Sequence, residues 1–213
     1  MSTNVLIITE DFTHDQHVIM PIVRAMFAEI GRPSARVDML KRPPIRGLGN
    51  AKKAGILRDV VAVNKHVHVF LRIIDRDCDP GCRVGMMDID DELRSSLAER
   101  QCFLSECAYQ AIEAWALASA DDLPPKWPWN KVRQSRKPKD DCFKEYVTMH
   151  GLINSPSRGL VTLGSQAGKR YKRVRDLCGE IKHMEWRVKN FFESDDPRRT
   201  IGEPYDETCP VSY

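Results

Sequence analysis

The sequence lacks a large excess of charge of either sign. Lys and Arg together number 33 and Asp and Glu 30, which gives a formal net charge of +3. This balance argues against a protein that coats nucleic acid over its whole surface, although a local basic face is compatible with it. Long hydrophobic runs are also missing, and the first ten residues, MSTNVLIITE, hold only a short apolar run and no basic segment. We therefore expect neither a signal peptide nor a membrane span here, no membrane partner, and a cytoplasmic location.

Several motifs that would announce a function are absent as well. The seven cysteines have no regular spacing, which is typical of reduced thiols in a cytosolic protein. There is no G-x-x-x-x-G-K-[ST] loop, and GSQAGK at Gly164 to Lys169 lacks the required spacing, so ATP binding by that route is not expected. No Ser-His-Asp order, nucleophile elbow or internal repeat is present. At 213 residues, the chain is long enough for one domain of moderate size with a proper core.

Strand and helix patterns alternate along the first part of the chain. Apolar runs predict strands at residues 5–8, 35–40, 67–74 and 101–107. Helical patterns are expected at residues 13–30, 51–63, 88–99 and 109–120. Thr13, Asn50 and Asp88 are the expected caps, and Pro21 lies inside the first helix. This alternation predicts an α/β domain over residues 1–120, with a mostly parallel sheet flanked by helices.

The remaining chain differs in composition and shows no alternation of strands and helices. Residues 121–139, DDLPPKWPWNKVRQSRKPK, are rich in Pro, Trp and base and predict a long loop. A turn-rich segment is expected at 155–168, and helices are expected at 140–150, 168–179 and 182–192. Together these segments form a basic, mostly helical C-terminal region over residues 121–193, and residues 194–213 predict an irregular tail.

Acidic residues follow two of the predicted strands. Glu10 follows the first strand, and Asp75, Asp77 and Asp79 follow the third. If the chain stays extended, residues two apart point the same way, so these three carboxylates would lean toward one spot. Ligands gather at the carboxyl ends of strands in open α/β sheets, and right-handed crossovers can bring two such ends together. Clustered carboxylates repel one another, and their oxygens suit Mg²⁺ or Mn²⁺, metals that serve phosphoryl chemistry.

The same acidic stretch admits other interpretations. A helix-loop-helix calcium site has this Asp spacing, but it needs glycine where Pro80 stands and glutamate where Met86 stands. A zinc knuckle through Cys78 and Cys82 lacks a second Cys or His pair nearby. A solvated acidic turn, which needs no ligand, stays open.

A glutamate that closes the first strand, with a D-x-D that closes a later one, resembles the Toprim domain of topoisomerases, primases and nucleases of the overcoming-lysogenization-defect type. The matching residues are Glu10 in VLIITEDFTHD and Asp75 and Asp77 in FLRIIDRDCD. The blocks AIEAWALASA, KPKDDCFKEY and YKRVRDLCGEI are similar to small standalone Toprim-like proteins, which are often encoded beside an ABC-type ATPase in anti-phage defence loci. The resemblance covers most of residues 4–193. It departs close behind the glutamate, where family members often have a glycine, whereas Asp11, Phe12 and Thr13 follow here.

The resemblance implies a metal-dependent endonuclease that hydrolyses DNA or RNA phosphodiesters as an effector of anti-phage defence. Glu10, Asp75 and Asp77 would bind Mg²⁺ (or Mn²⁺), with Glu10 as ligand or general base, while Asp79 would be an outer acid or simply solvated. Glu113 would assist catalysis if its helix faces the acidic edge, and it is otherwise an exposed helix residue. An ABC-type ATPase subunit is the implied partner. Two alternatives stay open: a Toprim-like interaction subunit with little activity of its own, and a phosphatase that acts on a small phosphoester.

Basic residues in the C-terminal half are candidates for contact with nucleic acid. Some flank Trp127 and Trp129. Basic residues beside aromatic ones are suited to contact the phosphate backbone of a nucleic acid and to stack on its bases. A solvated face, or tryptophans that anchor the loop to the core, would explain the same pattern. His14 and His17 fit a surface helix face better than a substrate contact. The residues that we expect to contact nucleic acid are Lys126, Arg133, Arg136, Lys137, Lys139, Lys169, Arg170, Lys172 and Arg173.

Overall fold

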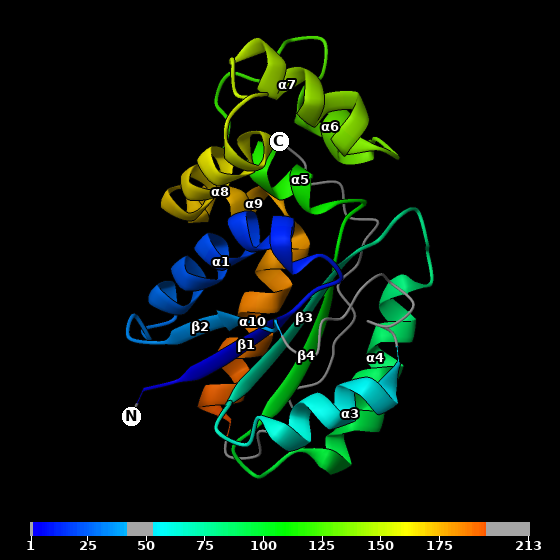
Figure 1. Ribbon diagram of the computed structural model, residues 1–213, viewed down its shortest axis with the longest axis vertical. Coiled ribbons are helices and arrows are strands. Elements are labelled where there is room, and N and C mark those ends of the chain that lie inside the picture. Colours follow the sequence, from blue (N-terminus) through cyan, green and yellow to red (C-terminus); the bar gives the residue numbers. More distant parts are fainter. Residues whose placement is uncertain (1, 42–52, 195–213) are drawn as a thin grey trace.

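The computed structural model describes residues 2–41 and 53–194 of the chain. Within these residues, four strands form one parallel sheet in the order β2-β1-β3-β4 (Figure 1). The strands are β1 (Asn4–Ile8), β2 (Arg36–Met39), β3 (Val69–Asp75) and β4 (Cys102–Ala108). The predicted fold class, a parallel α/β sheet flanked by helices with further helices in the C-terminal part, is confirmed. Asn50, the expected helix cap, and nearly all of the expected tail lie outside the described residues.

Helices cover both faces of the sheet, and the side chains of β3 from Val69 to Ile74 are therefore all buried. Leu71 and Ile73 belong to a core shared with α1 (Phe12–Glu29) and α10 (Gly179–Glu193). Phe70 and Ile74 point the other way, into a core shared with α3 (Ala54–Val63) and α4 (Cys82–Leu93). A strand buried on both faces reads as a continuous apolar run, which is why the sequence identified it. Figure 1 shows α10 to the left of β3 and β4 and α4 to their right.

The first helix begins differently from the prediction. The carboxylate of Asp11 accepts hydrogen bonds from the backbone N–H groups of Thr13 and His14, at 3.0 and 3.3 Å. Asp11 is therefore the N-cap, and the expected capping box from Thr13 was wrong. Gln16 donates to the carbonyl of Thr13 instead. The residue that directly follows Glu10 thus caps α1.

Several other helix bounds also differ from expectation. The helix α4 begins at Cys82 rather than Asp88, and buries Cys82, Met86 and Leu93 along one side. The 3₁₀ turn η1 (Arg94–Ser96) follows it. Gln110 is left-handed, with φ at 66°, and its neighbour Ala111 is extended, so α5 is confined to Ile112–Leu117. The expected loop at 121–139 contains the short helix α6 (Trp129–Gln134).

The C-terminal part is more helical than its glycines suggested. Its remaining elements are the π-turn η2 (Lys139–Phe143), α7 (Lys144–Met149), the 3₁₀ turn η3 (Pro156–Gly159), α8 (Leu160–Lys169) and α9 (Tyr171–Leu177). The segment expected to be turn-rich at 155–168 is therefore helical from Leu160. Among the described residues, no helix has both the length and the apolar character needed to cross a membrane.

The helices α1 and α8 touch at the backbone. A Cβ atom on Gly164 would lie 1.9 Å from the carbonyl oxygen of His17, and one on Gly168 would lie 2.8 Å from Cβ of Pro21. Only glycine fits at these two places, so GSQAGK is a close helix contact rather than a phosphate loop. One continuous apolar core then joins the N-terminal half to the C-terminal helices.

Candidate functional site

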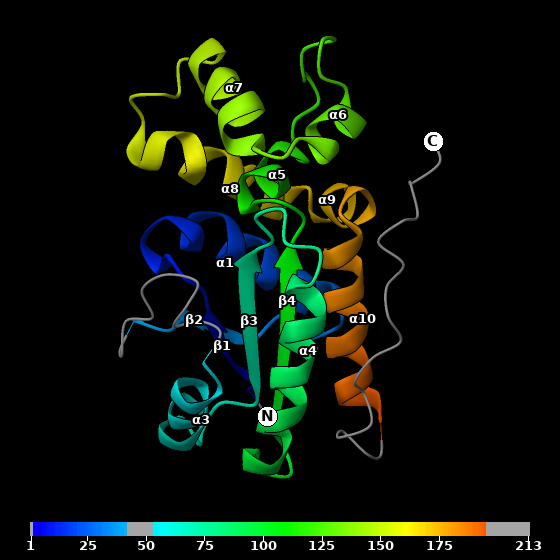
Figure 2. The ribbon, with the colours of Figure 1, turned by 90° about the vertical axis from the view of Figure 1, so that its right-hand side faces the viewer.

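Acidic side chains converge where neighbouring strands end. Glu10 follows β1, Asp75 is the last residue of β3, and Glu113 lies in the first turn of α5, which follows β4. β1 pairs with β3 and β3 pairs with β4, so the three positions lie side by side at one edge of the sheet. Figure 2 shows β3 and β4 pointing toward α5 at this edge. Glu113 is buried, with 6% of its surface exposed, so it is not an ordinary surface-helix residue.

Two contacts to Asp75 join these elements. One carboxylate oxygen of Asp75 accepts a hydrogen bond of 2.9 Å from the backbone N–H of Ile112, at the start of α5. The backbone N–H of Asp75 lies 3.5 Å from Oε1 of Glu10, at the outer limit of a hydrogen bond. Burial, and then the negative charges of Glu113 and Asp15, raise the pKa of Asp75 well above its ordinary value. The carboxyl group of Asp75 is therefore partly buried and lies among the other negative charges at this edge of the sheet.

Asp15 is a fourth acid at this edge, which the sequence did not reveal. It lies in the first turn of α1, and the hydroxyl of Thr9 donates a hydrogen bond to its carboxylate. Burial, together with the charges of Asp11 and Glu113, raises the pKa of Asp15 from 3.8 to about 6, and the Thr9 hydrogen bond opposes part of that rise. An acid in the first turn of a helix is common, so its position alone carried no signal. We call Glu10, Asp15, Asp75 and Glu113 the acid cluster.

A single lysine reaches the acid cluster from the C-terminal half. The ammonium group of Lys139 lies 2.8 Å from Oε1 of Glu113. Partial burial lowers the pKa of Lys139, but the hydrogen bond to Glu113 and the negative charges of Glu113, Asp75 and Asp15 outweigh it and raise that pKa. Lys139 was predicted to contact nucleic acid, and the structure brings it directly beside the candidate site.

The other two predicted aspartates occupy a turn. Asp77 and Cys78 are left-handed, with φ at 49° and 62°, so the chain does not stay extended after Asp75 and the expected alignment of three carboxylates was wrong. The turn is held by Gln110, whose carbonyl accepts from the backbone N–H of Asp77 at 3.2 Å and whose side chain accepts from that of Cys78 at 2.8 Å. The side chain of Asp77 is exposed. That of Asp79 accepts a hydrogen bond from the backbone two residues on, just before α4.

The chemistry of the acid cluster suits a hard divalent cation. All its donors are carboxylate oxygens, and burial together with neighbouring negative charges raises the pKa values of Asp15 and Asp75, a cost that a cation would relieve. In the described part of the chain, however, no group of three or more His, Cys, Asp or Glu side chains is placed to hold one metal ion. The donor set therefore fits Mg²⁺ or Mn²⁺ in kind, while ligation requires the side chains to turn toward a common point. Cys82, the other half of the zinc alternative, is buried with its sulfur 2.7 Å from that of Cys107.

A pocket of about 580 Å³ opens beside Glu113. Residues of α1, α5, η2, α7, η3 and the start of α8 form its walls, and its volume lies in the usual range for ligand sites. It is lined by the apolar Phe143, Val147, Ile153 and Leu160, the polar Thr148 and Ser157, the basic Lys139, Lys144 and Arg158, and by Asp11, His14 and Glu113. Sequence reasoning had no means of finding it, because its walls come from segments far apart in the chain.

Most of the predicted basic contacts are engaged within the protein. Arg133 forms a two-pronged ion pair with the buried Glu180 and lies over the ring of Tyr109. Lys126 pairs with Glu145. Lys172 lies 3.4 Å from Glu29. Arg136, Lys137 and Lys169 have exposed side chains.

Arg170 and Arg173 hold the end of α5. Arg170 donates to the carbonyl of Ser119 at 2.8 Å, and Arg173 donates to those of Ala118 and Ala120, both at 3.0 Å. Both guanidinium groups also pair with Asp121. These contacts satisfy carbonyl groups that a helix C-terminus leaves without partners. They fix the helix that carries Glu113.

The tryptophans of the basic loop anchor it to the core. Trp127 is 3% exposed and packs edge-on against Tyr146. The indole N–H of Trp129 donates to the carbonyl of Leu177 at 3.3 Å. The anchoring interpretation of these residues is therefore the one that the structure supports, rather than base stacking.

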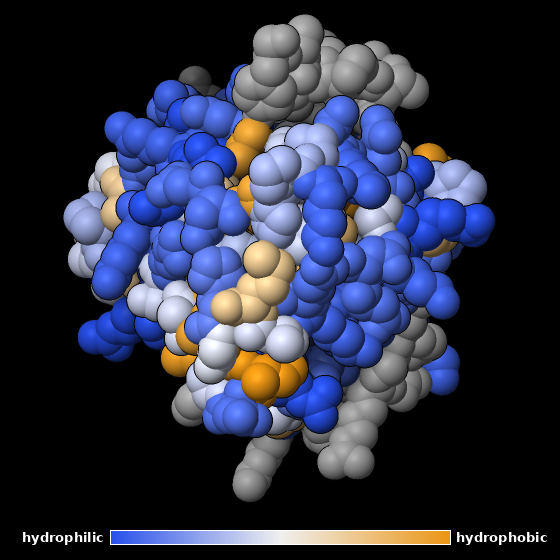
Figure 3. All heavy atoms as spheres, turned by 90° about the horizontal axis from the view of Figure 1, so that it is seen from above, coloured by the Kyte–Doolittle hydropathy of each residue, from blue (hydrophilic) through white to orange (hydrophobic). Residues whose placement is uncertain are grey.

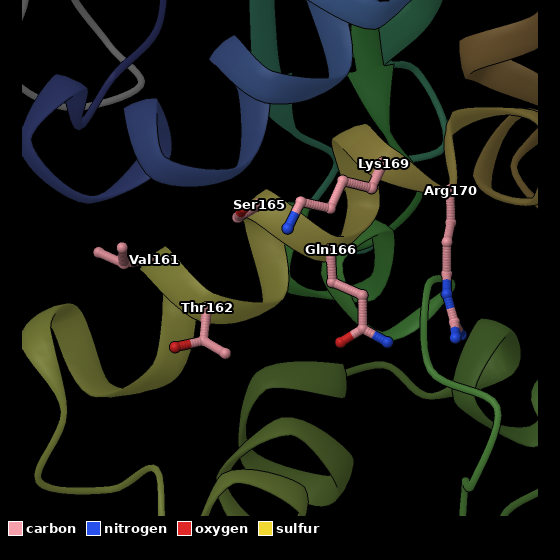
Figure 4. Close-up of a pocket in the computed structure, with 6 residues that line it drawn as sticks. All are labelled: Val161, Thr162, Ser165, Gln166, Lys169 and Arg170. Carbon is pink, nitrogen blue, oxygen red and sulfur yellow. The ribbon is translucent and has the colours of Figure 1, made fainter.

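A second hollow lies along α8. Figure 4 shows Val161, Thr162, Ser165, Gln166, Lys169 and Arg170 around it, and its volume is about 520 Å³. All six residues come from α8 and the residue after it, and none is acidic. This hollow adds nothing to the acid cluster.

The chain was compared with known proteins. No protein-family model, no curated protein and no solved structure matches it.

Proposed function

We propose that this chain is a metal-dependent hydrolase of nucleic-acid phosphodiesters that uses Mg²⁺ or Mn²⁺ and belongs to the Toprim-like nucleases. The observation that carries the proposal is the acid cluster, in which Glu10, Asp75 and Glu113 come from three adjacent strand ends. Carboxylates brought together in this way repel one another, and burial, together with the negative charges of Glu113 and Asp15, raises the pKa of Asp75. The sequence blocks that resemble the Toprim family lead to the same reaction.

The residues of the site suit distinct tasks. Glu10 and Asp75, with Asp15 beside them, would hold the cation, which polarises the phosphate and lowers the pKa of a water molecule when it is bound. Lys139 would neutralise a phosphate oxygen, and Glu113 would position that ammonium group from 2.8 Å. Asp15, whose pKa lies at about 6, changes protonation near neutral pH and is suited to moving a proton.

Exposed cations near the site support a polyanionic substrate. Arg136 and Lys137 precede Lys139 and have exposed side chains. Lys144 and Arg158 line the pocket beside Glu113. A chain of phosphates can follow such cations, whereas a small phosphoester would need only Lys139. DNA and RNA both meet this requirement.

A second candidate function is that of a Toprim-like interaction subunit with little activity of its own. It is favoured by the ion pair between Lys139 and Glu113, which supplies positive charge within the acid cluster.

The proposed partner of either form is an ABC-type ATPase, within an anti-phage defence system. The support is the family resemblance, together with a sequence that has no nucleotide-binding loop of its own. A metal-dependent nuclease also needs restraint until infection, which a partner can supply.

The reaction is tested by incubating the purified chain with Mg²⁺, Mn²⁺ or EDTA and a panel of plasmid, genomic DNA and total tRNA. We expect cleavage of at least one substrate with metal and none with EDTA. Asp75→Asn should lower the rate at least about a hundredfold, because it removes a central carboxylate. Asp88→Asn, at an exposed position of α4, is the matched control and should keep full activity. The proposal would be refuted if the wild-type chain cleaves none of the substrates with either metal, both alone and in the presence of the proposed ATPase.

A further inference from the structure

We infer that the pocket beside Glu113 receives one nucleotide unit of a single-stranded nucleic acid, with the flat base against its apolar wall and the phosphate toward Lys139. The inference deepens the proposed function, on which it rests, by naming the form of the substrate. It is carried by the lining of the pocket, by Glu113, which belongs to both the pocket and the acid cluster, and by the backbone at the rim.

The lining of the pocket matches the parts of a nucleotide. Phe143, Val147, Ile153 and Leu160 supply an apolar wall. Base faces are apolar and pack on such surfaces with little dependence on sequence. The basic residues Lys139, Lys144 and Arg158 line the same space, as do the polar Thr148, whose hydroxyl donates to the carbonyl of Lys144, and Ser157. A ligand that is partly flat and apolar and partly anionic satisfies both kinds of wall.

The pocket and the acid cluster share Glu113. This side chain lines the pocket and bonds Lys139 at 2.8 Å, and its neighbour Ile112 donates a backbone hydrogen bond of 2.9 Å to the carboxylate of Asp75. A phosphate that meets Lys139 therefore lies next to the proposed metal ligands, while the attached nucleoside extends away from them into the pocket. A base inside a duplex cannot enter a pocket of this kind without leaving its stack, so an unpaired strand is the favoured substrate.

The rim of the pocket holds a strained backbone. Ser157 and Arg158 are both left-handed, with φ at 52° and 50°, and Gly159 follows with φ at 85°. A Cβ atom on Gly159 would lie 2.8 Å from the side chain of Val147, so glycine is required there. Consecutive left-handed residues other than glycine are costly and gather at ligand clamps. Here they present Arg158, which has no side-chain partner among the described residues, at the pocket.

Seen from above in Figure 3, the surface on the side of α6 and α7 is largely hydrophilic, with few hydrophobic areas. Ile153 is a large hydrophobic side chain that is 38% exposed and lines the pocket, whereas Met149, on α7, is 59% exposed and does not. The two positions form a matched pair for substitution, because both are exposed and neither change disturbs the core.

The test measures binding in EDTA, where no hydrolysis occurs, with fluorescein-labelled single-stranded oligonucleotides of DNA and RNA and with the same strands in duplex form. We expect the chain to prefer a single strand. Ile153→Asp and Arg158→Gln should each weaken binding about tenfold, by loss of the apolar wall and of one phosphate contact. Met149→Asp, and Lys65→Gln at an exposed position before β3, are the controls and should bind as the wild type does.

The possible outcomes separate this inference from the proposed function. Equal binding by the pocket variants and the controls, or tighter binding of duplex than of single strand, would overturn the nucleotide pocket whether or not the chain cleaves. Loss of binding confined to the pocket variants, without metal-dependent cleavage of any substrate, would keep the pocket and refute the hydrolase. A wild-type chain that binds no oligonucleotide overturns the inference.

Discussion

Replacing Asp15 by asparagine should stabilise the folded protein at neutral pH. The pKa of Asp15 rises from 3.8 to about 6 on folding, so above that pH the folded state holds an ionised group that it disfavours. At ~1.4 kcal/mol per pKa unit, the cost approaches about 3 kcal/mol, and partial exposure of the side chain reduces it to about 1–2 kcal/mol. Asparagine keeps an oxygen that can accept the hydrogen bond from Thr9 and carries no charge to be repelled by Glu113.

The sign of the pH dependence is fixed by the direction of the pKa change. A carboxyl group whose pKa is higher in the folded state destabilises that state fully above about 6, and not at all below the ordinary value of 3.8. The gain in Asp15→Asn should therefore emerge between pH 4 and pH 6 and stay constant above.

Urea unfolding of the wild type and the variant at about pH 3.5, 5 and 7.5 measures this gain. The difference between the two proteins is compared, because the other carboxyl groups titrate in both. Equal or lower stability of the variant at pH 7.5, or a gain that is the same at every pH, would show that burial and the neighbouring charges do not disfavour the ionised form of Asp15.

Three further predictions concern the site and its surroundings. Glu113→Gln should slow hydrolysis at least about tenfold without lowering the thermal midpoint, because Lys139 loses an ionic partner; full activity would contradict its place in the site. Changing Arg136, Lys137 and Lys139 to glutamine together should reduce the salt slope of nucleic-acid binding by about 0.7–0.9 for each lost contact, and an unchanged slope would indicate a solvated or protein-docking face. Co-expression with the proposed ABC-type ATPase partner should give one peak in size-exclusion chromatography; separate elution with and without ATP, and no toxicity of the chain alone, would contradict the partnership.

The strands were predictable because buried strands appear in the sequence as apolar segments. Val69 to Ile74 is apolar except for Arg72, since both faces of β3 are covered, and Glu10 and Asp75 mark the strand ends that follow from it. Glycine was misleading in α8, where Gly164 and Gly168 read as turn residues but serve a close contact between helices. That contact depends on the backbone of α1, which no local pattern in residues 155–168 can show.

The site was only partly predictable, for a similar reason. Glu10, Asp75 and Glu113 could be placed from strand order, whereas Asp77 turns away because Gln110 holds a left-handed turn across from it. Asp15 and Lys139 enter only through tertiary structure. Lys139 stands in a basic run that has the composition of a phosphate-binding segment, and the sequence holds no sign that it meets Glu113.

The backbone contact between α1 and α8 has a consequence for how the protein folds. Gly164 meets His17 across most of the chain, so one side of α1 stays uncovered until the residues of α8 have been synthesised. Contacts between such distant segments slow folding, because a long loop must close before they form. The segment that carries Glu113 is held by Arg170 and Arg173, just beyond α8. The acid cluster is therefore expected to mature late, after the C-terminal helices have docked, and a chain released early would carry its acidic strand ends without the assembled site.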